Sequence, residues 1–114
     1  MSKTLKELGD ELKEMMIELQ MDAYNKQNFR PERYNNLCLK MDIAYNPQPH
    51  VMVVMSMSSA EFDLKTLEKT NGGLGQDEKY IQRWFSKPNT VPALMTCWKN
   101  VERNRGRISD KYKV

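Results

Sequence analysis

The only histidine of the chain, His50, is the residue best suited to chemistry. It follows the proline-rich stretch Asn46-Pro47-Gln48-Pro49 and directly precedes an apolar run. An imidazole, whose unperturbed pKa of about 6.5 lies close to neutral pH, could serve as a general acid or base. That role needs a carboxylate to orient the ring, and Asp42, eight residues earlier, is the candidate.

A structural role for His50 is the competing interpretation. In that case the histidine begins a strand and bonds to the backbone of a turn that the two prolines stiffen. With one histidine and two distant cysteines, no metal site is expected from local spacing. Since the sequence also has no glycine-rich phosphate loop, nucleophile elbow or paired-carboxylate pattern, we expect no cofactor, and no reaction can be named.

The second group of candidate residues is basic. Between Lys99 and Val114 six bases and two acids give a net charge of +4. The whole chain carries +3, so its excess of positive charge lies in this C-terminal segment. We call the four bases Lys99, Arg103, Arg105 and Arg107 the basic cluster. These residues could meet phosphates or an acidic partner. They could equally complement the negative end of a helix and remain solvated.

The elements that position these candidates begin with an N-terminal helix, which we assign to residues 1–28. Apolar residues recur at helical spacing between residues 4 and 25: Leu5, Leu8, Leu12, Met15, Met16 and Leu19. Thr4 and Glu7 have the spacing of a capping box, in which each side chain satisfies a backbone N–H of the other residue.

A three-stranded antiparallel meander is expected next. Residues 37–43 alternate apolar and polar, residues 51–57 are apolar on both faces at first, and residues 59–66 alternate again. The glycine-rich residues 71–75 are expected to form a turn or crossing. If the second strand is apolar on both faces, one face must be covered, either by the N-terminal helix or by a second subunit.

Two helices complete the expected α+β fold, as a helical hairpin packed on one sheet face. The first covers residues 76–86, and the second runs from an N-cap at Thr90 to Gly106, with Trp84 and Trp98 pointing inward. The 114 residues are expected to form one domain: the N-terminal helix, a unit of strands and two helices over 34–105, and a basic tail over 107–114. A helix-turn-helix over 64–87 is an alternative for part of it.

Location follows from the same composition. No apolar run approaches the roughly 20 residues that a membrane span needs. The first residues lack the apolar segment of a secretory signal, so a cytoplasmic protein is expected. We accordingly expect Cys38 and Cys97 to be reduced, packed thiols.

Residues 45–101 resemble a small bacterial family catalogued as domain of unknown function four thousand one hundred sixty. Its turn between two strands has the form Asn-Pro-x-Pro-His, which stands here as Asn46, Pro47, Pro49 and His50. A third strand, a glycine-leucine crossing and two helices with one tryptophan each follow in the family, and here they correspond to residues 60–66, Gly72-Gly73-Leu74, Trp84 and Trp98.

Two positions depart from this family pattern. Met52 stands where the family has a second histidine, and Leu67 stands where it has a glycine. The missing histidine weakens any scheme that uses a pair of imidazoles. Genes of the family are often found beside toxin–antitoxin-type partners, so the resemblance implies a setting and not a mechanism.

The function that these observations favour is protein binding, by a small regulatory protein of a toxin–antitoxin-like pair. Its candidate surfaces are the turn residues Asn46, Pro47, Pro49 and His50 and the basic cluster. The methionine-rich second strand and the additional N-terminal helix, which could also mediate self-association, motivate the proposal. One alternative is a nucleic-acid-binding protein that uses the basic cluster. Another is a hydrolase or nuclease toxin with His50 at its centre, although we expect a binding protein rather than an enzyme.

Overall fold

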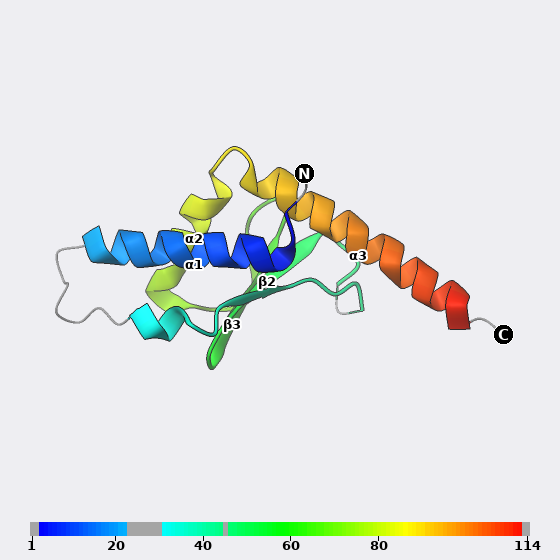
Figure 1. Cartoon of the computed structure of the whole chain (residues 1–114), viewed down its shortest axis with the longest axis horizontal. Helices are drawn as coiled ribbons and strands as arrows, with labels where there is room; N and C mark the ends of the chain where they lie inside the picture. The colour runs from blue at the N-terminus through cyan, green and yellow to red at the C-terminus, as the bar shows by residue number, and fades with distance from the viewer. Residues whose placement is uncertain (1–2, 23–30, 45, 113–114) are drawn as a thin grey trace.

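The structure is a computed structural model that describes residues 3–22, 31–44 and 46–112. It has the α+β architecture that the sequence predicts, with an N-terminal helix, an antiparallel sheet and C-terminal helices (Figure 1). The sheet has four strands instead of three, in the order β1-β2-β3-β4. The strands follow one another in the sheet without crossovers, and two short 3-10 helices, η2 (Pro31–Tyr34) and η3 (Gly75–Asp77), lie among the described elements.

The helix α1 (Leu5–Asp22) begins with the capping box that the sequence predicts. The Glu7 backbone N–H donates to Thr4 Oγ1 at 3.1 Å, and the Thr4 backbone N–H donates to Glu7 Oε1 at 3.3 Å. Leu8, Leu12 and Met16 are buried, which confirms the apolar face of this helix. The predicted continuation of the helix beyond Asp22 lies outside the described residues.

The sheet is a meander of β1 (Cys38–Lys40), β2 (His50–Met55), β3 (Ser58–Asp63) and β4 (Lys69–Gly72). The predicted bounds of the first three strands, 37–43, 51–57 and 59–66, are too long. The second strand ends where Ser56 adopts a φ of 46°, so that Ser56 and Met57 form the turn. The third ends at Asp63, whose carboxylate accepts the backbone N–H groups of Lys65 and Thr66 at 2.7 and 3.0 Å.

The fourth strand was missed because nothing in its sequence marks it as a strand. All its residues are exposed, so it lacks the apolar alternation that indicates a half-buried strand. Gly72, which we assigned to a turn, has a φ of 70° and approaches β3 closely: a Cβ there would lie 2.2 Å from the Ser59 carbonyl oxygen. Strands at residues 58–63 and 69–72 also rule out the helix-turn-helix alternative.

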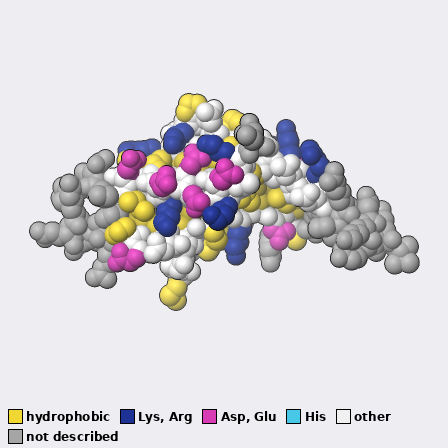
Figure 2. All heavy atoms as spheres, viewed as in Figure 1, with side chains coloured by type: hydrophobic (Ala, Val, Ile, Leu, Met, Phe, Trp, Pro, Cys, Tyr) yellow, Lys and Arg dark blue, Asp and Glu magenta, His cyan; other side chains and the backbone are white. Residues whose placement is uncertain are grey.

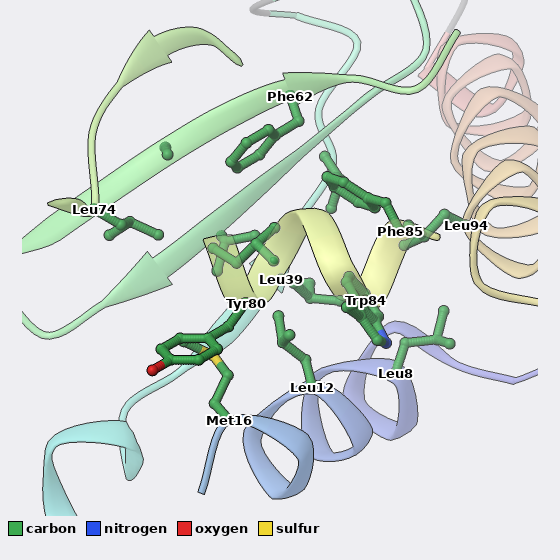
Figure 3. Packing of buried hydrophobic residues seen from close by; sticks show 14 of the residues in the cluster. Leu8, Leu12, Met16, Leu39, Phe62, Leu74, Tyr80, Trp84, Phe85 and Leu94 are labelled. Atoms are coloured by element: carbon green, nitrogen blue, oxygen red, sulfur yellow. The ribbon is translucent and has the colours of Figure 1, made fainter. Parts of the chain in front are cut away.

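The helix α2 (Glu78–Phe85), entered through the 3-10 turn η3 (Gly75–Asp77), packs beside α1, which itself lies directly against β1 (Figure 3). Its side chains Tyr80, Ile81, Trp84 and Phe85 are all buried. The Phe85 ring meets Phe62 of β3 edge-on at 5.3 Å, while Trp84 reaches toward Leu8 and Leu12 of α1. Trp84 and Trp98 both point inward, as the sequence predicts.

The helix α3 (Thr90–Tyr112) is longer than predicted. The sequence analysis ended it at Gly106, yet the helix passes through this glycine. A single glycine costs a helix only about 1 kcal/mol relative to alanine, which does not by itself end it. The predicted basic tail over 107–114 is helical as far as Tyr112, and α3 extends away from the rest of the molecule (Figure 1).

Candidate functional site

His50 begins β2 and has the structural role that the sequence analysis offered as an alternative to catalysis. It is 2% exposed, and its Nδ1 lies 2.8 Å from the Gln48 carbonyl oxygen. Since a carbonyl only accepts, Nδ1 carries the proton and donates it. The ring packs edge-on against Trp98 of α3, with the ring centres 5.0 Å apart.

The rest of the predicted binding turn is also bonded within the molecule. Asn46 Oδ1 accepts the Gln48 N–H at 3.0 Å, and Asn46 Nδ2 donates to Glu61 Oε1 at 3.1 Å. The Pro49 carbonyl accepts the Leu64 N–H at 3.0 Å. Of the turn residues 46–50, only Pro47 and Gln48 are exposed. These bonds join the turn to Glu61 of β3 and to Leu64 just after that strand.

The sequence analysis missed Glu61, which receives the bond from Asn46. This carboxylate is 9% exposed, and Thr70 Oγ1 of β4 also donates to its Oε1, at 3.1 Å. Glu61 therefore links the proline turn to the edge strand across β3. The alternating pattern of residues 59–66 does not indicate that Glu61 links these elements, because its partners Asn46 and Thr70 lie in other segments of the chain.

A hollow of about 440 Å³ lies beside the end of β1, which stops at Lys40, several residues before the proline turn. The register pairs Lys40 with Met52, so Asp42 would face His50 if β1 continued by two residues. Both residues line the hollow, which Leu5, Lys40, Met41 and Met52 complete. Asp42 Oδ1 accepts the Ala44 N–H at 2.8 Å.

A second hollow, of about 300 Å³, lies beside the β2–β3 turn and is lined by an ion pair between exposed Arg33 and buried Asp77. Arg33 Nη2 lies 2.7 Å from Asp77 Oδ2, and the Tyr34 hydroxyl donates to Asp77 Oδ1 at 3.1 Å. Burial, followed by the negative charge of Asp77, raises the pKa of Tyr34 to about 12. Met57, at the turn, is 100% exposed.

The two faces of the sheet differ in cover. Residues that pair across strands share a face. Leu39, Val53 and Ala60 are such a set, and they are buried under α1 and α2, on what we call the core face. The opposite side, which we call the outer face, carries Cys38, Lys40, Met52, Val54, Ser59 and Glu61.

The outer face is accessible in the described structure. Cys38 and Lys40 are exposed, and Met52 and Val54 are only half-buried. The expectation of two packed thiols is therefore wrong for Cys38 and right for Cys97, which is buried. Burial raises the pKa of the Cys97 thiol. The exposed side of α1, by contrast, carries interspersed acidic and basic side chains (Figure 2).

The basic cluster lies on α3, where Lys99 and Arg103 are exposed. The side chains of Arg105 and Arg107 lie outside the described part of the structure. Among the described side chains, no group of three or more His, Cys, Asp or Glu residues could hold a metal ion. No helix within the described ranges is long and apolar enough to cross a membrane.

No protein-family model, no curated protein and no solved structure matches this chain. The resemblance to a domain of unknown function therefore stays a prediction that rests on the quoted residues.

Proposed function

We propose that this protein acts by binding another protein, and that the outer face of its sheet is the binding surface. The observation that carries the proposal is the half-buried pair Met52 and Val54 at the centre of that face. The solvated side of an antiparallel sheet is normally polar. Here β2 is apolar on both sides. The helices α1 and α2 pack on the core face, and Trp98 of α3 packs on His50 at one end of the outer face.

Neighbouring residues support this assignment. Cys38 and Ser59 flank Val54 on either side, so the centre of the face carries no charge in this row. Interface cores are typically poor in charge, and methionine is enriched in them. Lys40 and Glu61, on the two strands that flank β2, could give the surface its specificity.

The geometry gives less support to a hydrolase or nuclease centred on His50. The Nδ1 atom of His50 is already bonded to the Gln48 backbone carbonyl, and the imidazole ring packs edge-on against Trp98. A cytoplasmic role in a toxin–antitoxin-like pair remains part of the proposal, supported by the family resemblance alone.

The test is affinity purification from the native cell with three tagged forms of the chain. The wild type and Met57→Asp, which changes an exposed apolar residue away from the outer face, should retain the same partner. Val54→Asp should lose it, because an unpaired carboxylate would be buried in the interface. Retention of the partner by purified, folded Val54→Asp would show that the outer face is not the binding surface.

Nucleic-acid binding is a second candidate, and the continuity of α3 favours it. Because the helix passes through Gly106, Lys99, Arg103 and Arg107 stand at four-residue intervals on one uninterrupted helix. Arg103→Glu should then abolish a gel shift of RNA or DNA at low salt, with Lys79→Glu on α2 as the control. Absence of any shift by the wild type at low salt would remove this candidate.

A further inference from the structure

We propose that the partner on the outer face is a second copy of this chain, packed face to face as a symmetric dimer. The inference rests on the proposed function, because it concerns the same surface. It follows from the way in which opposite charges are distributed on either side of β2.

The strand register arranges the outer face in rows. One row contains Lys40 on β1, Met52 on β2 and Glu61 on β3. The next row contains Cys38, Val54 and Ser59 in the same order. The cation and the carboxylate thus lie on opposite sides of an apolar central line, two strand spacings apart.

Neither of these charges is compensated within the described structure. Glu61 receives hydrogen bonds from two neutral groups, the Asn46 amide and the Thr70 hydroxyl. No described Lys or Arg lies within ion-pair distance of Glu61, and no described carboxylate lies within that distance of Lys40. A carboxylate that is 9% exposed without a cation is costly, so a nearby positive charge would stabilise it.

A two-fold axis parallel to β2 would supply that charge. This rotation places β1 of one copy over β3 of the other while it keeps each row in register. Lys40 then faces the partner's Glu61, and the two copies of Val54 meet at the centre. The contact between Lys40 and Glu61 then occurs twice, once on each side of the axis, as a closed dimer requires.

The other face-to-face arrangement does not compensate the charges. An axis across the strands would place β1 on β1 and β3 on β3. Both copies of Lys40 would then lie on one side of the interface and both copies of Glu61 on the other. Opposite charges that face one another favour the first arrangement.

Cross-linking through Cys38 tests this geometry. In the proposed dimer Cys38 lies over the partner's Ser59. The Ser59→Cys variant should therefore form a disulfide-linked dimer on mild oxidation, just as a disulfide joins the two packed sheets of immunoglobulin domains. Within one chain the two positions are separated by β2, about 9.5 Å apart, which is too far for a disulfide. Wild type and Ser58→Cys, a neighbouring position whose side chain alternates to the other face, should stay unlinked.

Sedimentation at a series of protein concentrations gives an independent measurement. We expect a reversible dimer for the wild type and for Met57→Asp. For Val54→Asp, with its fold checked by circular dichroism, the dissociation constant should rise about a hundredfold, because two carboxylates would be buried together.

Three outcomes would overturn the proposal. A wild-type dimer that Val54→Asp leaves unchanged would place the interface elsewhere, and a disulfide between two Cys38 thiols of the wild type would contradict the symmetry. A wild type that stays monomeric at millimolar concentration, but retains a different partner that Val54→Asp loses, would exclude the second copy and leave the proposed function standing.

Discussion

The two faces of the sheet are made by the same strands but serve different purposes. On the core face Val53, Ala60 and Phe62 are fully buried, under a helix layer that brings Trp84 and Phe85 against them. On the outer face the polar residues are engaged locally, as Glu61 shows by joining the proline turn to β4. The comparison teaches that burial stabilises one face, whereas the apolar centre of the other, Met52 and Val54, stays only half-buried.

The largest expected effect is a difference in the free energy of unfolding between a substitution beneath the core face and one on the outer face. Trp84→Ala should lower the free energy of unfolding by about 3–5 kcal/mol, since it empties the space between α1, α2 and the sheet. The Trp84 Nε1–H has no hydrogen-bond partner among the described residues, so this cost is one of packing. Val54→Ala on the outer face should cost no more than about 1 kcal/mol in the monomer, where the side chain is only half-buried. Urea titrations measure both, and equal losses would contradict the comparison.

The next effect concerns Tyr34, whose ionisation is opposed by its burial beside Asp77. Its pKa is about 12 in the folded protein and 10.0 for the unperturbed group. Between these values the unfolded state loses its proton first and binds fewer protons than the native state, so stability falls as the pH rises. The free energy of unfolding should stay level up to about pH 10 and then drop by about 3 kcal/mol.

Tyr34→Phe is the matched control for that titration. Phenylalanine cannot ionise, so the difference between the variant and the wild type should shrink by the same amount over this range of pH. A wild-type profile that runs parallel to that of the variant would show that Tyr34 does not titrate with a raised pKa.

A smaller loss of stability is expected from a substitution of His50. This residue lies in register with the outer face, yet it is buried against Trp98. His50→Phe can keep the ring contact but not the bond to the Gln48 carbonyl, so thermal unfolding should report a loss of about 1 kcal/mol. Partner binding should be unchanged, and an activity that disappears in this folded variant would restore the catalytic interpretation.

The smallest expected effect lies at the turn where both faces end. Ser56 has a φ of 46°, a region that glycine adopts without strain. Ser56→Gly should therefore raise the stability slightly, by about 0.5–1 kcal/mol, and Ser58→Gly in the adjoining strand should lower it by a similar amount. Chemical denaturation curves of both variants, compared with the wild type, provide the measurement.

The sequence alone determined the elements whose signals are local. Steps of three and four residues placed Leu8, Leu12 and Met16 on one face of α1, and the Thr4–Glu7 spacing fixed where that helix begins. Apolar strands on either side of Asn46-Pro47-Gln48-Pro49 indicated the β1–β2 connection, and the inward tryptophans were predicted correctly. Such features depend on backbone periodicity and on neighbours within one turn, so a single segment contains the information.

Only the tertiary structure decided which residues far apart in the chain become neighbours. The Arg33–Asp77 ion pair and the bonds of Glu61 to Asn46 and Thr70 join segments that no local pattern connects. The strand β4 is defined by its pairing with β3 and not by its own composition. Likewise, the apolar run of β2 indicated that one face needs a further cover, but only the packing of α1 and α2 showed which face these helices cover.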